Sequence, residues 1–351
     1  GSGRTVIPAT IRAATEALVT TSGLGRLEKV KMLPGGANNR VFRLICENRT
    51  VVLKSYFRDP GDTRDRLEAE YGFINFAWAH GLNSVAEPIG KDSTAGLALY
   101  GALPGRAILS NDVTHEIVRQ ALTFFLDLNA HRKAKDAEHI HPGSEACFSF
   151  AAHIATVNRR MEYLSIIKSD DPLDRDLRAF MAEKLIPYWK ILSSHVCEQA
   201  VTSGIAADSS LTLDERCLSP SDFGFHNALL DEEGTIRFVD FEYAGWDDPA
   251  KMVGDFFNQV AIPVPSIHQS NFTDAVASLS PKPEIALKRI NLLMPIYSCK
   301  WICIILNDFL PTDARRRRFA TSATTDEIKT RKKVQLEKAR YRLSRLRDHT
   351  N

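Results

Sequence analysis

Three polar residues in the second half of the chain have the types and the spacing of a metal-assisted phosphoryl-transfer site. Asp222 is followed five residues later by Asn227, and Asp240 lies eighteen residues after Asp222 in an apolar segment. Phosphoryl transfer requires that an acceptor hydroxyl be positioned and that charge on the phosphates be neutralised, usually by magnesium. Carboxylate and carboxamide oxygens are ligands that magnesium prefers. We therefore interpret Asp222 as the catalytic residue and Asn227 and Asp240 as metal ligands.

The residues between Asn227 and Asp240 are typical of a β-hairpin. Residues 228–230 and 236–239 are predicted to be short strands, and the turn-forming stretch 231–234 joins them. A hairpin places Asn227 and Asp240 at strand ends, where they can face each other. Each of the three residues, taken alone, is explained better as a turn or strand-end residue. Their joint spacing favours the phosphoryl-transfer interpretation.

Two motifs, Ser221-Asp-Phe-Gly-Phe-His-Asn227 and Phe238-Val-Asp-Phe-Glu-Tyr243, resemble those of the aminoglycoside phosphotransferase and choline kinase superfamily of small-molecule kinases. In that family a His-Gly-Asp-x-x-x-x-Asn loop supplies a catalytic Asp and a metal-binding Asn, and a later Asp-Phe/Trp-Glu segment supplies a second metal ligand. The resemblance, which covers nearly the whole chain, assigns these roles to Asp222, Asn227 and Asp240. It departs at Pro220 and Ser221, which stand where the family has His and Gly.

The resemblance implies an α+β, bilobal, protein-kinase-like fold. The expected β-rich N-terminal lobe, residues 1–103, would bind the nucleotide and include a Gly-rich loop. The expected C-terminal lobe, residues 104–351, would be mostly helical, would carry the catalytic and acceptor-binding residues, and would end in a basic helix. Apolar residues at helical spacing agree with this plan and predict helices at 115–130, 148–163, 173–192, 250–260, 283–309 and 327–346.

The N-terminal part of the sequence offers candidate nucleotide-binding residues. Gly35, Gly36 and Asn38 lie in a Gly-rich turn before two predicted strands, 41–45 and 50–54, and the second of these ends at Lys54. A Gly pair or a strand-end lysine is weak evidence alone. Together they predict a hairpin over the phosphates and a lysine that contacts the α- and β-phosphates.

A lysine in this role needs a carboxylate that orients it, and the predicted helix 66–81 offers two. Glu70 lies beside the apolar stripe of this helix and Glu68 lies away from it, so we expect Glu70 to pair with Lys54. The alternative is that Glu70 is a solvated charge at the edge of the stripe.

A further predicted strand, 97–103, corresponds in related kinases to the hinge between the lobes, where backbone groups bind the adenine edge. Tyr100 and Ala102 are the residues expected to do so. Because side chains contribute little there, ATP is expected and GTP stays open.

Length and composition agree with a cytoplasmic, membrane-free protein. The 351 residues, 44% of them hydrophobic, suffice for two lobes, and no eighteen-residue apolar stretch is free of charge. Six scattered cysteines show no zinc spacing and favour a reducing compartment. Residues 311–351 carry thirteen Lys or Arg against five Asp or Glu. Apolar residues at helical spacing among these charges favour a packed terminal helix over nucleic-acid binding, which would call for interleaved aromatic residues.

The expected function is Mg²⁺-dependent transfer of a nucleotide γ-phosphate to a hydroxyl of a small molecule, by resemblance a sugar, amino sugar or amino alcohol. Two alternatives remain open. The missing loop His would suit a nucleotide-binding pseudokinase that acts as an interaction or regulatory module, and an open cleft would suit kinase activity on proteins or sugar-modified amines. The sequence does not choose the acceptor.

Overall fold

The computed structural model describes residues 7–34, 39–311, 313, 319 and 323–350. The chain divides into two compact units, each discontinuous in sequence. The first consists of residues 1–144, 225–245 and 316–322, and the second of residues 145–224, 246–315 and 323–351. The predicted lobes, 1–103 and 104–351, are continuous segments of the sequence, whereas these units are not. The predicted lobe boundary therefore stays a prediction.

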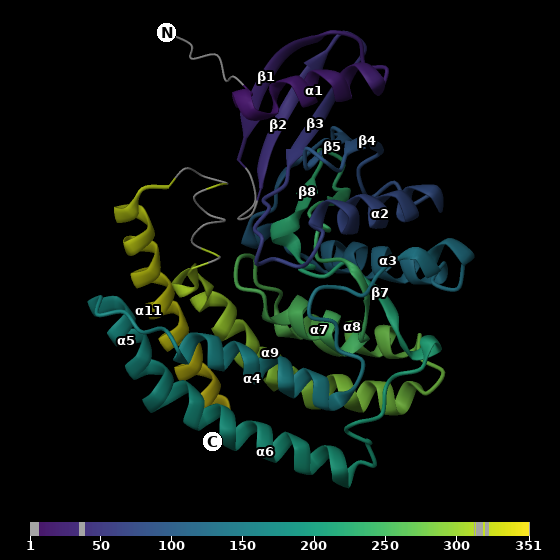
Figure 1. Ribbon diagram of the computed structural model, residues 1–351. Coiled ribbons are helices and arrows are strands. Elements are labelled where there is room, and N and C mark those ends of the chain that lie inside the picture. Colours follow the sequence, from purple (N-terminus) through teal and green to yellow (C-terminus); the bar gives the residue numbers. More distant parts are fainter. Residues whose placement is uncertain (1–6, 35–38, 312, 314–318, 320–322, 351) are drawn as a thin grey trace. The chain divides into compact units, whose positions relative to one another are not determined.

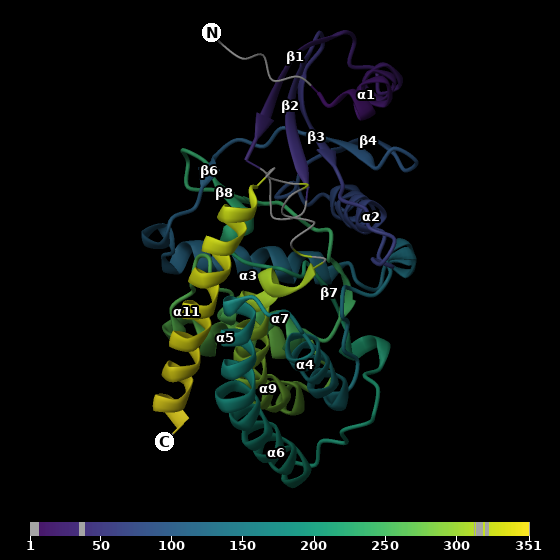
Figure 2. The same ribbon diagram turned by 60° about the vertical axis from the view of Figure 1, so that its left-hand side comes forward.

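The first unit is built on a five-stranded antiparallel sheet in the order β1-β2-β3-β5-β4 (Figure 1). Strands β2 and β3 extend each predicted strand by one or two residues, and β5 ends two residues before its predicted end. Helix α1, Ala9–Thr21, packs on the sheet through a shared apolar core (Figure 2). The strands are β1 Leu27–Leu33, β2 Arg40–Cys46, β3 Thr50–Ser55, β4 Pro88–Asp92 and β5 Leu97–Gly101.

Helix α2, Arg66–Ala79, connects the sheet to the candidate site. The Asp65 side chain accepts a hydrogen bond from the Glu68 backbone N–H and caps the first turn. The helix ends before Gly81, whose φ of +82° is a conformation that glycine adopts at little cost. These local signals explain why the predicted helix 66–81 is correct to within two residues.

A second, small sheet completes the first unit. Strands β8, Ala228–Leu230, and β9, Ile236–Phe238, form the predicted hairpin, and β6, Arg106–Ala107, pairs with β8. Helix α3, His115–Ala130, supports β9 through the stacked rings of Phe124 and Phe238, whose centroids lie 4.8 Å apart. The hairpin is therefore held on a rigid helix.

The second unit is mostly helical. Helices α4 and α6 both pack on α9, as the two views of the ribbon also show (Figures 1 and 2). The helices are α4 Phe150–Ser165, α5 Pro172–Phe180, α6 Ile186–Thr202, α7 Pro249–Asn258, α8 Gln269–Ala277, α9 Pro283–Ile305 and α11 Thr325–Thr350. Two short strands, β7 Cys217–Ser219 and β10 Gly245–Asp247, pair with each other.

The expected single helix 173–192 is instead two helices joined by a π-helical turn, Met181–Leu185. Pro187 lies in the first turn of α6 and has no backbone N–H to donate to the carbonyl four residues earlier. A π-helical turn before the proline accommodates the missing bond without ending the helical path.

Helix α9 and the 3₁₀ turn after it, Pro283–Phe309, are long and apolar enough to cross a membrane by length and composition alone. However, 61% of the most apolar window is buried inside the structure. Ile296, Cys299 and Ile302 have no exposed surface. The packing of the second unit therefore accounts for the apolar character of this helix.

The basic terminal helix α11 lays one face on the second unit, as expected. Leu336, Ala339 and Leu343 are buried, while Arg331 forms an ion pair with Asp308 at 2.8 Å. Basic residues at this end thus contribute to packing and to local ion pairs. The run of four arginines at 315–318 lies outside the described residues.

Candidate active site

Lys54 lies at the centre of the candidate site within the first unit. Strand β3 pairs with β2 on one side and β5 on the other, so the Lys54 backbone is fixed opposite Val41 and Ala98. The Lys54 ammonium nitrogen, Nζ, lies 2.8 Å from Oε1 of Glu70 and 2.8 Å from Oδ1 of Asp240. Two carboxylates from distant parts of the chain therefore hold one buried ammonium.

The electrostatic balance at this lysine favours the charged form. Burial lowers the pKa of Lys54, but attraction by Asp240, Glu70 and Glu242 outweighs burial and raises the pKa well above its ordinary value. The ammonium is thus retained over the whole range of physiological pH. A permanent positive charge at the end of this strand suits contact with phosphate oxygens.

Glu70, and not Glu68, is the carboxylate of α2 that contacts Lys54. Glu70 is 2% exposed and accepts hydrogen bonds from Lys54, the Tyr56 hydroxyl and the backbone N–H of Phe241. Burial raises its pKa, an effect that Lys54 opposes. Glu68 is partly exposed and binds Lys91 and Ser93 instead.

Asp240 follows strand β9 with its backbone in the left-handed region, at φ +64°. An L-residue in this region is uncommon, although Asp tolerates it better than most, and such strain concentrates at functional sites. The Asp240 side chain is 31% exposed, and among the described residues only its Oδ1 atom has a partner. Its Oδ2 atom can therefore accept a further ligand.

Asn227 is anchored beside Asp240 through the backbone. The Val239 N–H donates to the Asn227 carbonyl oxygen over 2.9 Å, next to the paired residues Ala228 and Phe238. The two side chains supply a carboxylate and a carboxamide oxygen, which are hard donors and fit Mg²⁺. The donor set of this segment is thus compatible with the predicted metal.

Asp222 belongs to the second unit, whereas Lys54, Glu70, Asn227 and Asp240 belong to the first. Ser221 and Asp222 have φ angles of +49° and +41°, so both adopt the left-handed conformation. The resemblance places a glycine at the position of Ser221, and glycine adopts this conformation without steric cost. Ser221 therefore adopts a backbone conformation in which a non-glycine residue is strained.

The nucleotide-contact residues expected from the sequence fall in different environments. The Tyr100 side chain is buried and its hydroxyl lies 2.7 Å from that of Tyr56, so it supports Glu70 from inside the first unit. Ala102 is exposed just beyond β5. Gly35, Gly36 and Asn38 lie outside the described residues.

Sequence reasoning missed a set of polar residues that brace the Asp240 segment. The Asn39 side chain donates to Glu242 over 2.6 Å and accepts from the Phe57 backbone N–H over 2.9 Å. Arg64 donates to the carbonyls of Glu242 and Ala244 over 2.9 and 3.0 Å. The signal available in the sequence was Glu242, a charged residue two positions after Asp240 in an apolar setting.

The second unit contains its own buried polar network around Asp248, the residue that caps α7. Asp248 accepts from His153 Nε2 over 2.8 Å and from Arg289 over 2.7 Å, and His153 Nδ1 contacts the Tyr297 hydroxyl. Asp255, on a later turn of α7, contacts Lys300 and Trp301 of α9. It is therefore a helix-packing carboxylate.

Comparison with known proteins supports the expected relationship. The model of a family described as "Phosphotransferase enzyme family" matches residues 29–263. No curated protein matches the sequence.

Several solved structures share the fold. Choline kinase LicA from Streptococcus pneumoniae is 13% identical with a TM-score of 0.56, over 96% of this chain and 99% of that one. An ethanolamine kinase from Plasmodium vivax is 14% identical with a TM-score of 0.53, over 90% of this chain and 84% of that one. A spectinomycin phosphotransferase, solved with ADP and spectinomycin, is 11% identical with a TM-score of 0.53, over 92% and 98%. These similarities confirm the predicted kinase-like α+β fold class.

Proposed function

The chain belongs to the phosphotransferase enzyme family, and we propose that it transfers the γ-phosphate of a nucleotide to a hydroxyl group of a small molecule in a Mg²⁺-dependent reaction. The observation that carries the proposal is the placement of the Lys54 ammonium 2.8 Å from both Glu70 and Asp240. Phosphoryl transfer depends mainly on positioning and on electrostatic stabilisation. A buried ammonium next to a partly exposed carboxylate provides both.

Within this proposal each residue of the first unit has a distinct task. Glu70 orients Lys54, and Lys54 contacts the phosphates of ATP, with GTP as the other candidate. The Oδ2 atom of Asp240 and the side chain of Asn227 would hold Mg²⁺, which when bound neutralises charge on the phosphate oxygens. Gly35, Gly36 and Asn38 would cover the phosphates, and Tyr100 and Ala102 would contribute backbone groups near the base.

Asp222 would orient the acceptor hydroxyl and accept its proton during transfer. Its carboxylate follows a bend whose two residues, Ser221 and Asp222, have positive φ angles, and strained backbone of this kind often presents a functional side chain. The acceptor class is a sugar, amino sugar or amino alcohol, in line with the choline, ethanolamine and spectinomycin named for proteins of similar fold.

A second candidate is a nucleotide-binding pseudokinase. The observation in its favour is the replacement of the expected loop His and Gly by Pro220 and Ser221. Against it, Lys54, Glu70 and Asp240 form a complete ion-pair set, and Asp240 keeps one carboxylate oxygen that has no partner among the described residues.

The test is a screen of nucleotide consumption with ATP and GTP against a panel of sugars, amino sugars, amino alcohols and proteins. Acceptor-dependent release of the nucleoside diphosphate is expected with one small-molecule class. Calorimetric titration with nucleotide, with and without Mg²⁺, accompanies the screen. Tight Mg²⁺-dependent binding without turnover on any acceptor would favour the pseudokinase, and equal binding with and without Mg²⁺ would remove the metal assignment.

A further inference from the structure

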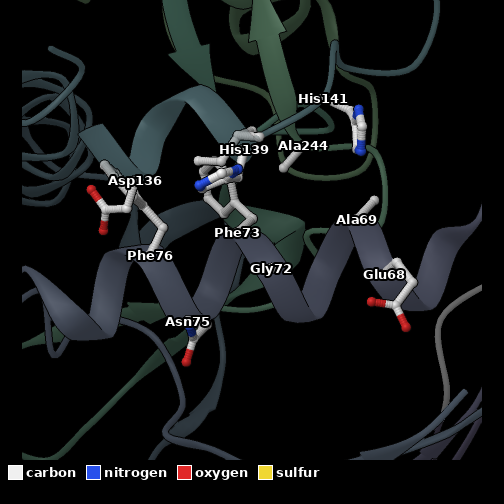
Figure 3. Close-up of a pocket in the computed structure, with 11 residues that line it drawn as sticks. Glu68, Ala69, Gly72, Phe73, Asn75, Phe76, Asp136, His139, His141 and Ala244 are labelled. Atoms are coloured by element: carbon white, nitrogen blue, oxygen red, sulfur yellow. The ribbon is translucent and has the colours of Figure 1, made fainter. Parts of the chain in front are cut away.

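A cavity of about 230 Å³ lies on the side of helix α2 away from Glu70, entirely within the first unit (Figure 3). One wall is α2 and the other is the segment after residue 135 together with Ala244. Figure 3 shows Ala69, Phe73 and Phe76 rising from α2 towards Asp136, His139 and His141. The proposed phosphoryl transfer assigns no role to the residues that line this cavity.

The floor of the cavity contains a glycine that packing does not require. Gly72 lies in the middle of α2, where glycine costs about 0.5–1 kcal/mol relative to alanine. A Cβ atom added to Gly72 would meet no atom within 4 Å. The lack of a side chain at Gly72 therefore leaves open space beside the apolar rings of Phe73 and Phe76. This space is called the notch below.

The two carboxylates at the rim of the cavity already have partners. Glu68 binds Lys91 and Ser93, and Asp136 lies 2.9 Å from His80. The remaining rim groups are the imidazoles of His139 and His141 and the amide of Asn75. The side chains of these three make no hydrogen bond or ion pair with any residue that the structure describes.

Volume and lining together define a class of ligand. A cavity of roughly 150 Å³ can hold benzene, so this cavity can hold one substituted ring. The apolar floor favours a planar ring without a net charge, because an unpaired charge is costly to bury. The rim favours substituents that donate and accept hydrogen bonds.

The floor of the cavity is connected to the Lys54 site by direct packing. The Phe73 ring stacks on the Phe241 ring with centroids 5.2 Å apart, and the backbone N–H of Phe241 donates to Glu70. Glu70 and Gly72 are two positions apart on α2, so they lie on opposite faces of the helix. A ligand in the cavity would thus contact the face of α2 opposite Glu70 and would not touch Glu70 itself.

We propose that this cavity is a regulatory site for a small, uncharged ring compound, whose binding holds α2 in the position in which Glu70 contacts Lys54. The binding half of the proposal stands on the cavity alone. The regulatory half rests on the proposed function, because it requires that Lys54 bind a nucleotide. Linkage then requires that nucleotide and ligand strengthen each other's binding equally.

The binding test uses 4-hydroxybenzamide as the probe, with anionic 4-hydroxybenzoate and cationic 4-hydroxybenzylamine as matched charged probes. For a ligand of this size we expect a Kd on the order of 0.1–1 mM, and at least about tenfold weaker binding of both charged probes. Absence of saturable binding up to about 10 mM, well above that Kd, would overturn the proposal.

Two substitutions at one position locate the probe. Gly72→Leu fills the notch and should weaken binding at least tenfold, whereas Gly72→Ala adds one carbon and should keep the Kd within about threefold. Equal affinity in wild type and Gly72→Leu would place the probe elsewhere. Should Gly72→Leu fail to fold, the exposed pair His139→Ala and His141→Ala serves instead and should weaken binding about fivefold. His115→Ala, outside the cavity, is the control for that pair, and unchanged affinity in the pair would overturn the rim assignment.

The regulatory half is tested by the affinity of wild type for Mg-ATP, measured by calorimetry with and without saturating 4-hydroxybenzamide. We expect about fivefold tighter nucleotide binding with the probe, at the low end of ordinary coupling. Unchanged nucleotide affinity would overturn the regulatory half. Absence of any nucleotide binding without the probe would instead contradict the proposed function, so the two failures are distinguishable.

Discussion

Replacement of Glu70 by glutamine removes one negative charge from the Lys54 site while almost preserving the shape of the side chain. The buried ammonium then keeps Asp240 at 2.8 Å as its charged partner. A buried charge left without a partner costs about 3–5 kcal/mol. Because one partner remains, we expect Glu70→Gln to lower the free energy of unfolding by about 1–3 kcal/mol, as for the loss of a buried hydrogen bond to a charged group.

The effect on turnover should exceed the effect on stability. Glu70 also accepts hydrogen bonds from Tyr56 and from the backbone N–H of Phe241, so its neutralisation loosens both Lys54 and the segment that carries Asp240. Misplacement of a positioning group by about 1 Å can lower a rate by about 100-fold. We therefore expect kcat/KM for the acceptor reaction to fall by about that factor.

Glu68→Gln is the matched control, since it makes the same chemical change two residues away on the same helix. Glu68 and its partner Lys91 have side chains that are 39% and 36% exposed, and ion pairs of this kind contribute at most about 1 kcal/mol. Urea unfolding and steady-state kinetics of both variants measure the contrast. Equal losses in the two variants, or a larger loss for Glu68→Gln, would refute the assignment of Glu70 as the residue that orients Lys54.

Three further predictions concern other parts of the structure. Asp222→Asn should keep its affinity for Mg-nucleotide, measured by titration. It should lower acceptor-dependent transfer at least ~100-fold, which is the usual effect of a positioned acid or base. Full activity of the variant would remove Asp222 from the catalytic role. Burial lowers the pKa of His153, but attraction by Cys147 and the hydrogen bond to Asp248 raise it from 6.5 to about 9. Protonated His153 should therefore contribute at most about 3 kcal/mol of stability below pH 6.5, lost as pH rises to about 9. Denaturant unfolding at several pH values should show this slope in wild type and not in His153→Gln, and identical slopes would contradict it. Ser221→Gly should raise the free energy of unfolding by roughly 0.5–1 kcal/mol, because glycine accepts the φ of +49° without strain; a loss of stability would mean that the Ser221 hydroxyl matters more than the backbone.

Elements with local signals were predictable from the sequence. Helix α3 begins and ends at the predicted residues, because Thr114 caps it and its apolar residues recur at helical spacing. The β8 strand also has its predicted bounds, since a turn rich in Asp, Glu and Gly follows it. In contrast, helices α1 and α8 were not predicted, and the π-helical turn Met181–Leu185 depends on hydrogen-bond geometry that a pattern of apolar residues does not contain.

The candidate site was predictable only in part. Sequence spacing alone distinguished Glu70 from Glu68, because a helix period decides which residue faces the interior. The contact of Lys54 with Asp240 joins residues 186 positions apart, so no local pattern indicates it, and the sequence analysis did not predict it. The bracing bond between Asn39 and Glu242 spans 203 positions and was missed for the same reason.

The discontinuity of the first unit determines the order in which the site can form during synthesis. At about 5–20 residues per second, a ribosome makes Asp240 roughly 10–40 s after Lys54, which precedes it by 186 residues. During that interval Lys54 and Glu70 lack Asp240, the third residue of their ion-pair set. The Phe73 ring also lacks Phe241, on which it stacks in the finished protein. A nascent chain released at residue 144 would therefore present an open apolar surface and an incompletely paired ammonium. The Lys54 site can thus form only after the whole of the 145–224 segment of the second unit has been made.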